Sequence, residues 1–458
     1  MYARCISPLA MSQQVFDESP YLRDVVSWTA LIAGYVQHRH GQEALSHLDR
    51  MQLEGVAPNV VTFVGILKAC GMIGGVTKGK EFHARIARES VLEKNNILGT
   101  ALVDMYAKCG MIHKAQEVFH DLPVHDVISW NSLISGYAEH GLRDEALDCL
   151  MHMQHEGISP NGTTLVCLLK ACHGSESLAM GEKIHSEAVK TGLLGKSVVL
   201  GNAIIDMYVK CNMLEKGKGV FEDELLERDT ASWNTMINGY SRHGLDHEAV
   251  GLFLRMQEER LSPPNAITFV CVLKACGSIG ALEMGEEIHS EVSKGGVIKR
   301  NIILGNALVD MYAKCGMLGH AQQVFDELPI RDVITWTTLI SGFCLHGHNV
   351  KALSCFYLMR HEGLSPDAAT FACVLKVCGQ AKEIEKGKGI HIEVVRRRSL
   401  LELEKNVTLE NTLVDMYAAC GFLMEAKQVF TTLSTQDILS WNALIGGYAE
   451  HGKDHEAL

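Results

Sequence analysis

A stretch of 35 residues at 127–161, VISWNSLISGYAEHGLRDEALDCLMHMQHEGISPN, recurs in closely related form along the chain. Similar text begins at residues 25, 230, 333 and 438. All five tryptophans mark these copies, at intervals of 102, 103, 103 and 105 residues: Trp28, Trp130, Trp233, Trp336 and Trp441. A fixed period is typical of a tandem array in which each repeat packs on its neighbours. The 458 residues are therefore expected to form one elongated array rather than two or three ordinary domains.

Each copy has the pattern of two helices. Trp130, Leu133, Ile134 and Tyr137 recur at the i, i+3, i+4, i+7 spacing of an amphipathic α-helix. Gly141 interrupts this pattern, a second helical segment follows, and a glycine and a proline close the copy. A single helical hairpin buries little surface, whereas stacked hairpins share a continuous core. The sequence therefore predicts an all-α fold of the solenoid type.

The period divides into three unlike hairpins, and the chain contains partial units at 1–24 and 438–458. The opening residues MYARC match MYAKC at 105–109 and 311–315, so we expect the chain to start within a repeat, without a visible targeting segment. The complete units are 25–59, 127–161, 230–265 and 333–367 of the first kind, 60–95, 162–197, 266–301 and 368–406 of the second, and 96–126, 198–229, 302–332 and 407–437 of the third.

The rotation of unit lengths indicates a repeat family. Tetratricopeptide units share the W-x2-L pattern, but they keep a uniform length of 34 residues and place a glycine directly after that leucine. The alternation seen here, with SPN or RD closing the units, resembles the pentatricopeptide repeat family, specifically its plant subclass with P, L and S motifs. The resemblance covers essentially the whole chain. It implies a right-handed superhelix of helical hairpins that binds single-stranded RNA in mitochondria or chloroplasts, most often for C-to-U editing.

In such a family each repeat recognises one base with a few side chains. The resemblance implies that these are the fifth residue of the first helix and the last residue of the unit. The first-kind units then pair Thr29 with Asn59, Asn131 with Asn161, Asn234 with Asn265, and Thr337 with Asp367; the third-kind units pair Thr100 with Asp126, Asn202 with Asp229, Asn306 with Asp332, and Asn411 with Asp437. All are short polar residues that can bond a base edge.

The family pattern suggests that Thr with Asn recognises A, Thr with Asp recognises G, Asn with Asp recognises U, and Asn with Asn recognises C or U. An Asn or Asp at the end of a helical unit has another explanation, because these residues often cap the next helix. The second-kind units have Val64, Val166, Val270 and Ala372 at the fifth position. We expect these units to space the RNA rather than to recognise bases strongly.

The second residue of each unit is mostly apolar, and the resemblance implies that these side chains sandwich the bases. The candidates are Val26, Ile97, Ile128, Val199, Ile267, Ile303 and Ile334, while Thr163 and Thr408 depart from the pattern. The alternative is ordinary packing on a helix face. Lysines recur at the thirteenth position of three third-kind units, where they either contact phosphates or are merely solvated; they are Lys108, Lys210 and Lys314.

Charge and composition bound the remaining possibilities. The net charge of −12 argues weakly against indiscriminate nucleic-acid binding and slightly favours the competing hypothesis, a protein-binding helical scaffold. The 15 cysteines mostly fall at fixed repeat positions, as expected for small buried thiols. No apolar run reaches the length of a membrane-spanning helix.

No catalytic site is expected. His185, His289 and His391 each start an H-x-E motif, but the P-C-x-x-C half of a zinc deaminase signature is missing from the sequence. We therefore predict no metal, no cofactor and no enzymatic activity. Deaminase segments of the E and DYW type that editing proteins often carry are also not seen in this sequence, so editing would need a further segment or a deaminase partner acting in trans.

Overall fold

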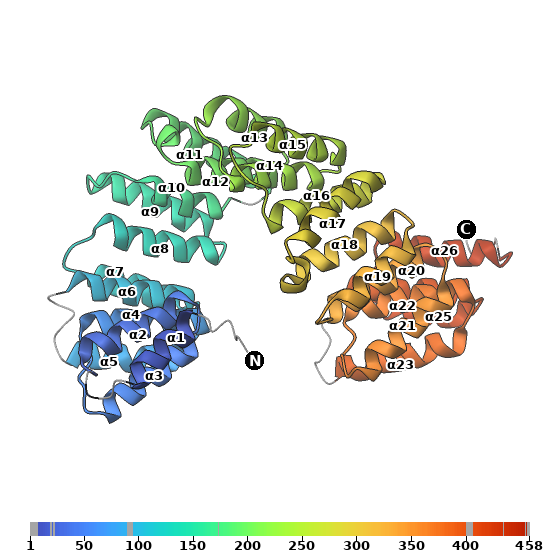
Figure 1. Ribbon diagram of the computed structural model, residues 1–458, viewed down its shortest axis with the longest axis horizontal. Helices are drawn as coiled ribbons and strands as arrows, with labels where there is room; N and C mark the ends of the chain where they lie inside the picture. Colours follow the sequence, from blue (N-terminus) through green and yellow to red (C-terminus); the bar gives the residue numbers. More distant parts are fainter. Residues whose placement is uncertain are drawn as a thin grey trace. The chain divides into compact units, whose positions relative to one another are not determined.

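The structure is a computed structural model that describes residues 8–18, 21, 23–88, 95–172, 174–399, 406–433, 435–453 and 455. The partial unit expected at the start of the chain therefore lies partly outside the described residues. The chain forms two compact units, Met1–Arg228 and Asp229–Leu458, and each consists of helical hairpins (Figure 1).

In the first compact unit, residues 1–228, the first helices of the hairpins are α2 (Val25–Gln37), α4 (Val60–Ile73), α6 (Asn96–Lys108), α8 (Val127–Glu139), α10 (Gly162–Lys170) and α12 (Val198–Lys210). The second helices are α1 (Pro8–Glu18), α3 (Gly41–Leu53), α5 (Val76–Arg88), α7 (Ile112–His120), α9 (Arg143–His155), α11 (Leu178–Lys190) and α13 (Leu214–Gly219).

In the second compact unit, residues 229–458, the first helices of the hairpins are α14 (Thr230–Arg242), α16 (Ala266–Ile279), α18 (Ile302–Lys314), α20 (Val333–Leu345), α22 (Ala368–Ala381), α24 (Val407–Ala419) and α26 (Ile438–Glu450). The second helices are α15 (Asp246–Glu259), α17 (Leu282–Lys294), α19 (Leu318–Glu327), α21 (Asn349–His361), α23 (Ile384–Ser399) and α25 (Leu423–Thr431).

The helix α8 shows why the local sequence folds in this way. Asp126 caps its N-terminus by accepting the Ser129 backbone N–H at 2.8 Å, and the Ser129 hydroxyl in turn accepts the Asp126 backbone N–H at 2.9 Å. The predicted apolar stripe from Trp130 to Tyr137 is buried. Gly141 follows the helix with a φ of +71°, a left-handed conformation that favours glycine.

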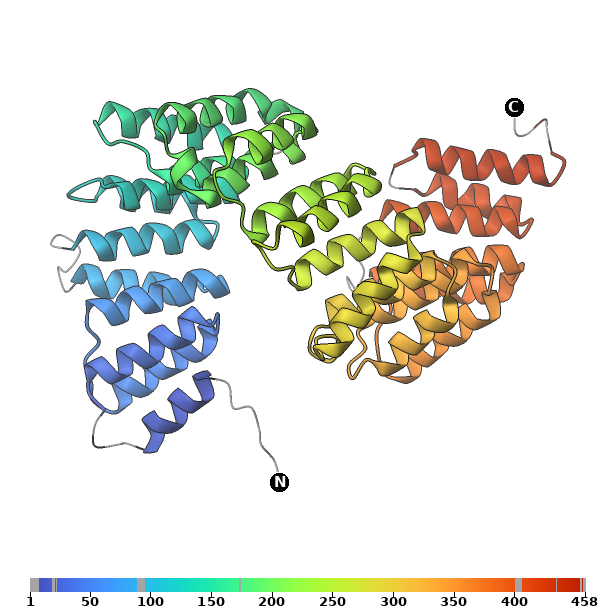
Figure 2. The same cartoon turned by 45° about the horizontal axis from the view of Figure 1, so that its top comes forward.

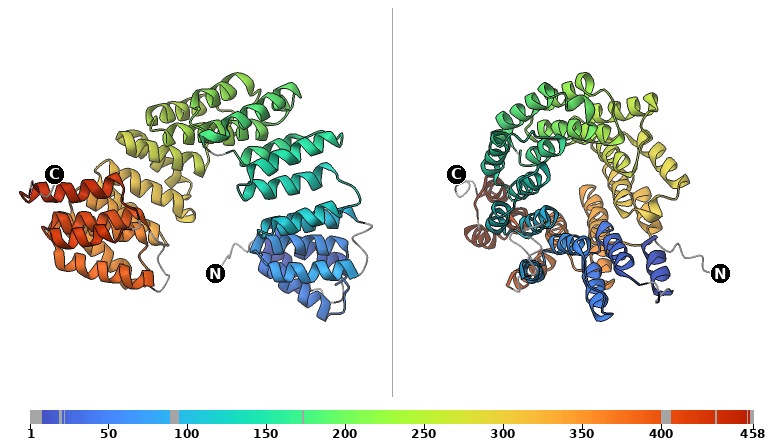
Figure 3. Two further views of the ribbon diagram at one scale, coloured as in Figure 1. Left: turned by 180° about the vertical axis from the view of Figure 1, so that it is seen from behind. Right: turned by 90° about the vertical axis from the view of Figure 1, so that its left-hand side faces the viewer.

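Within each unit the helices form two layers. Successive first helices pack on one another, as in the series α4, α6, α8 and α10, and the second helix of a hairpin packs on its first helix, as α9 does on α8 (Figures 2 and 3). The large side chains at these contacts, such as Trp28, Tyr106 and Phe253, are fully buried. The layer of first helices carries the fifth and second positions of every repeat, so the candidate base-binding residues line one layer.

One hairpin departs from the regular pattern. The unit 198–229 is one residue longer than the others of its kind, and its second helix changes to a π-helical turn at Val220–Glu224. A π turn accommodates one extra residue without ending the helix. The inserted residue is therefore absorbed inside the helix, and the terminal Asp229 keeps its place as the N-cap of α14.

Candidate nucleic-acid interface

The fifth residue of the first helix and the last residue of the unit meet in space, although about 30 positions separate them in the sequence. In unit 127–161 the Asn131 amide donates to Asn161 Oδ1 at 3.4 Å, and in unit 230–265 the Asn234 amide donates to Asn265 Oδ1 at 3.2 Å. These positions converge because the hairpin folds the end of the unit back onto the start of its first helix.

The Asn411–Asp437 pair of unit 407–437 is the most tightly joined. The Asn411 amide donates to both carboxylate oxygens, at 3.0 and 3.1 Å. The backbone N–H of Ser440 is the largest influence that lowers the pKa of Asp437, and the Asn411 and Ser440 side chains lower it further. The carboxylate is therefore ionised at neutral pH and acts only as an acceptor.

In two first-kind units a threonine of the following hairpin joins the pair. The hydroxyls of Thr29 and Thr62 are 2.7 Å apart, and Thr62 Oγ1 donates to Asn59 Oδ1 at 2.9 Å. The hydroxyls of Thr337 and Thr370 are 2.6 Å apart, and Thr370 Oγ1 donates to Asp367 Oδ1 at 2.7 Å. The two positions thus belong to one hydrogen-bonded cluster in each of these units.

Two further pairs are not joined in this way. Among the described residues, no direct hydrogen bond links Thr100 to Asp126 or Asn306 to Asp332. Asn202 lies in the first compact unit and is half-buried, whereas Asp229 begins the second compact unit, is exposed and caps α14.

The last residues of all eight first-kind and third-kind units cap the next helix, as the alternative explanation of these Asn and Asp residues predicted. Each accepts the backbone N–H of the third helical residue with a side-chain oxygen; they are Asn59, Asp126, Asn161, Asp229, Asn265, Asp332, Asp367 and Asp437. The cap occupies Oδ1 and fixes the side-chain rotamer. It leaves the Nδ2 amino group of an asparagine, or the Oδ2 atom of an aspartate, as the second polar atom.

The fifth-position asparagines carry a recurrent unsatisfied acceptor. The carbonyl oxygens of Asn131, Asn234, Asn306 and Asn411 are buried and have no hydrogen-bond partner among the described residues. An unsatisfied buried polar atom costs about 1–3 kcal/mol. The same unsatisfied atom thus recurs at the fifth position of four units.

The seven candidate stacking residues are all exposed. Val26, Ile97, Ile128, Val199, Ile267, Ile303 and Ile334 have exposed fractions between 60% and 68%. They do not pack on a helix face, as the alternative explanation would require. Val61 and Leu439, which were not among the predicted residues, occupy the same second position and are 61% and 67% exposed. Their repeat position was the signal that could have identified them.

The three candidate phosphate-binding lysines are not free. Each is paired with the aspartate one turn earlier on its own helix: Lys108 with Asp104 at 2.7 Å, Lys210 with Asp206 at 2.6 Å and Lys314 with Asp310 at 2.7 Å. A second series of lysines, which was not predicted, is exposed in the repeated LKAC-like motif of the second-kind units: Lys68, Lys170, Lys274 and Lys376. Lys170 and Lys210 line one cavity of about 110 Å³ with Asp206.

The histidines of the H-x-E motifs are bonded within the helical stack. His185, His289 and His391 each lie 2.9 Å from a tyrosine hydroxyl of the following first helix, as His83 does in the first copy. The described cysteines are free, and burial raises the pKa of Cys70 to about 11 and that of Cys149 to about 12. These groups therefore have the character of packing residues.

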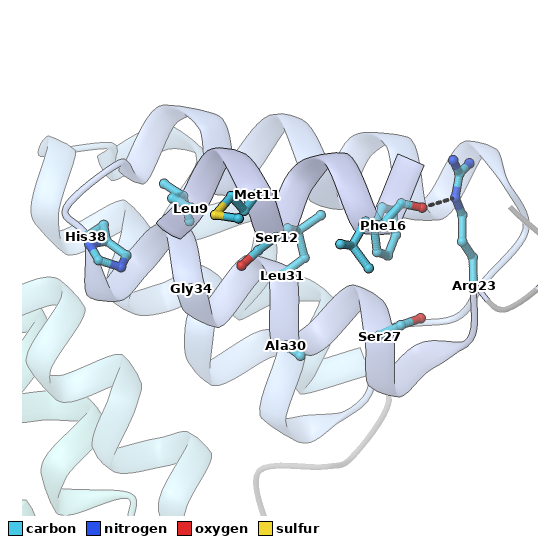
Figure 4. Close-up of a pocket in the computed structure, with 11 residues that line it drawn as sticks. Leu9, Met11, Ser12, Phe16, Arg23, Ser27, Ala30, Leu31, Gly34 and His38 are labelled. Atoms are coloured by element: carbon cyan, nitrogen blue, oxygen red, sulfur yellow. Dashed lines mark hydrogen bonds between the residues drawn. The ribbon is translucent and has the colours of Figure 1, made fainter. Parts of the chain in front are cut away.

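A mostly apolar cavity lies between the first two described helices. It has a volume of about 670 Å³ and is lined by α1 and α2, with Leu9, Val15, Phe16 and Leu31 among its walls (Figure 4). Arg23 closes one end and donates to the Phe16 carbonyl at 3.4 Å. Within the described residues, no helix combines the length and the apolar character needed to cross a membrane.

Comparison with known proteins places this geometry in a family. Residues 23–72, 125–174, 228–278 and 331–380 match a model described as the PPR repeat family, and residues 100–127, 202–223, 306–333 and 439–458 match one described as the PPR repeat. A chloroplastic pentatricopeptide repeat-containing protein of Arabidopsis thaliana is 34% identical over 99% of this chain and 72% of its own length. A mitochondrial one from the same plant is 33% identical over 99% of this chain and 65% of its own length.

The chain spans only part of its relatives, with 63% and 52% of two further Arabidopsis thaliana proteins covered. Among solved structures, the pentatricopeptide repeat protein PPR10 from maize matches with a TM-score of 0.50 and 19% identity over 98% of this chain and 75% of that one. PPR10 in complex with an 18-nucleotide psaJ RNA element matches with a TM-score of 0.52 and 16% identity over 98% and 81%. These similarities confirm the predicted all-α solenoid fold.

Proposed function

Because this chain belongs to the pentatricopeptide repeat family, we propose that it binds single-stranded RNA in a sequence-specific manner, with about one nucleotide per unit. We assign it to the subclass in which P, L and S motifs alternate, on the basis of the three kinds of hairpin. Its role is site recognition in organelle RNA processing, specifically for C-to-U editing. The organelle is the mitochondrion or the chloroplast, where related proteins are found.

The observation that carries this proposal is the second polar atom that each helix cap leaves. Guanine and uracil present an N–H group at the centre of the Watson–Crick edge, whereas adenine and cytosine present a bare ring nitrogen there. An aspartate Oδ2 accepts from the first two bases, and an asparagine Nδ2 donates to the other two. The last residue of a unit would therefore favour G or U when it is an aspartate, and A or C when it is an asparagine. The asparagine amide can also donate to a uracil carbonyl oxygen, so a unit with two asparagines would take either pyrimidine.

The fifth residue makes the second distinction. The short threonine side chains at positions 29, 100 and 337 leave room for a purine, and the longer asparagine amide suits a pyrimidine. The combination yields A for Thr29 with Asn59, G for Thr337 with Asp367, and U for Asn411 with Asp437. The exposed second-position residues, such as Ile303 and Ile334, would hold each base between two apolar side chains.

Selection from a random single-stranded RNA pool tests the proposal. The expected order, 5′ to 3′, is A, any base, G, pyrimidine, any base, U, pyrimidine, any base, U, G, any base, U. Enrichment of purines at the first, third and tenth positions would support this register, and its absence would reject it. Failure to select any RNA would favour the protein-binding scaffold instead. Deamination in this scheme comes from a partner or a further segment, and addition of an editing extract to the selected RNA would measure it.

A further inference from the structure

Asn96 distinguishes unit 96–126 from the other units of the third kind. It is the first residue of α6, and its Nδ2 amide donates to Asp126 Oδ2 at 3.0 Å. The corresponding residues of the other three units are Val198, Ile302 and Val407, which have no polar side-chain atom. Only this unit of the four can therefore make such a bond from its first residue.

The bond changes the acceptors that Asp126 can offer. Its Oδ1 already accepts the Ser129 backbone N–H at 2.8 Å, so each carboxylate oxygen has a partner. The carbonyl oxygen of Asn96 is buried and has no partner among the described residues. The Nδ2 bond is thus the side-chain hydrogen bond that orients the Asn96 amide.

Asp367 offers the useful comparison, because unit 333–367 has the same Thr and Asp pair. There Oδ1 accepts both the backbone N–H and the hydroxyl of Thr370, at 2.8 and 2.7 Å. No bond to its Oδ2 is found within the described part of the chain, and the residue is exposed. The first residue of this unit is Val333, which cannot donate a hydrogen bond.

Guanine presents two donors to such a carboxylate, N1–H and the N2 amino group, whereas uracil presents one, N3–H. An oxygen with both lone pairs free can accept both guanine donors. An oxygen that already accepts an amide has one lone pair left, which suffices for uracil. The Asn96 bond gives Asp126 Oδ2 the state found at Asp437, whose Oδ2 accepts the Asn411 amide in a unit assigned to uracil.

We propose that Asn96 is a third specificity-determining residue, which lowers the preference of unit 96–126 for guanine over uracil. The inference rests on the proposed RNA-binding function. It follows that the two units with the same Thr and Asp pair differ in specificity. Unit 333–367 discriminates strongly between guanine and uracil, whereas unit 96–126 discriminates weakly between them.

A reciprocal exchange tests the inference. Asn96→Val installs the residue type of the sister units, and Val333→Asn places the amide in the unit that lacks it. Binding is titrated with four RNAs that carry G or U at the third nucleotide and G or U at the tenth. The G-over-U ratio at the third nucleotide should rise about two- to tenfold in Asn96→Val, because one hydrogen bond becomes available. The ratio at the tenth should fall by a similar factor in Val333→Asn.

The possible outcomes distinguish a failure of the proposed RNA recognition from a failure of the proposed role of Asn96. If neither nucleotide shows any base preference in the wild-type protein, the proposed function fails. If the tenth nucleotide prefers guanine but wild-type ratios at the two nucleotides are equal, or if both substitutions leave the ratios unchanged, Asn96 has no role in specificity. Thermal unfolding of both variants serves as the folding control, and Val333→Asn alone decides the question if Asn96→Val unfolds.

Discussion

The aspartates and asparagines that end the units cap the next helix, and we propose that the same side chains also recognise a base. Asp367 accepts the Thr370 backbone N–H with Oδ1 and so stabilises the start of α22. An N-cap is worth about 1 kcal/mol, which alone would explain an Asp or Asn at this place. The cap does not explain why Thr or Asn also recurs at the fifth position, 30 residues earlier. The cap instead supplies the rigid rotamer that recognition of a base would need.

The Thr337 side chain provides the most direct test at this scale. Thr337→Asn recreates the combination of Asn306 with Asp332, so the longer amide should crowd a purine and favour uracil. We expect the preference at the tenth nucleotide to change from G to U by about tenfold or more, because a wrong base typically costs roughly 1–3 kcal/mol in nucleic-acid recognition. Titration of both proteins against the G and U forms of the selected RNA measures the change.

The neighbouring Thr338 is a matched control, because its hydroxyl bonds to the Ile334 carbonyl at 2.8 Å within the same helix. Thr338→Asn should leave every base preference unchanged. Equal losses on both RNAs in Thr337→Asn, or no change on either, would show that Thr337 is a packing residue.

At the scale of helices, the sequence was sufficient to predict the helical hairpins but not the side-chain contacts between residues that lie far apart in the sequence. The stripe from Trp130 to Tyr137 has a helical period, and this face is buried in the structure. The bond between Asn96 and Asp126 was not predictable, because 30 residues separate its partners and only the closed hairpin brings them together. The pairing of Lys108 with Asp104 was accessible, because residues four apart on a helix are neighbours; it was overlooked because the lysine was considered alone.

Adjacent glycines in α26 test how closely the first helices approach. A Cβ atom on Gly447 would lie 2.5 Å from the Ala418 Cβ of α24, whereas one on Gly446 would meet nothing within 4 Å. Gly447→Ala should therefore destabilise the protein by about 1–3 kcal/mol through overpacking. Gly446→Ala should stabilise it by about 0.4–1 kcal/mol, because glycine disfavours a helix. Urea unfolding of the two variants measures both effects, and equal shifts would contradict the close approach.

The recurrent histidine–tyrosine pairs between second-kind and third-kind hairpins should make stability depend on pH. Burial lowers the pKa of His83, His289 and His391 in the folded protein. Above the ordinary histidine pKa near 6.5 these histidines are neutral in both states and add no pH dependence. As the pH falls below that value, the unfolded chain binds protons that the folded chain does not, so stability falls by up to about 1.4 kcal/mol per pH unit and histidine.

Thermal unfolding between pH 7.5 and 5.5 should show this loss, and the loss should shrink when His83, His289 and His391 are replaced by glutamine, which does not titrate. His361 is exposed on α21, so His361→Gln is the control and should leave the slope unchanged. A triple variant with the wild-type slope would exclude these histidines as its source.

At the scale of the whole molecule, the acidic charge restricts where RNA can be held. The chain has 54 acidic and 42 basic side chains, so any attraction to phosphates must be local. The lysines Lys108, Lys210 and Lys314 lie on first helices, the layer that also carries the candidate base-binding positions. Their aspartate partners offset the positive charge locally, which in the proposed function would lower non-specific affinity and leave a donor close to the RNA strand.

The salt dependence of RNA binding tests whether these lysines contact phosphates. Binding to a single strand weakens with salt at a slope of about −0.7 per phosphate neutralised. Combined replacement of Lys108, Lys210 and Lys314 by alanine should flatten the slope by up to about 2 without altering base preference, because three contacts are lost. Replacement of Asp104, Asp206 and Asp310 by asparagine should instead strengthen binding at low salt, because the lysines are then released from their ion pairs.

The control replaces lysines on second helices by alanine, namely Lys78, Lys183 and Lys294, and should keep the wild-type slope. If the first-helix variant also keeps that slope, these lysines do not contact phosphates, and the exposed series that begins at Lys68 becomes the remaining candidate.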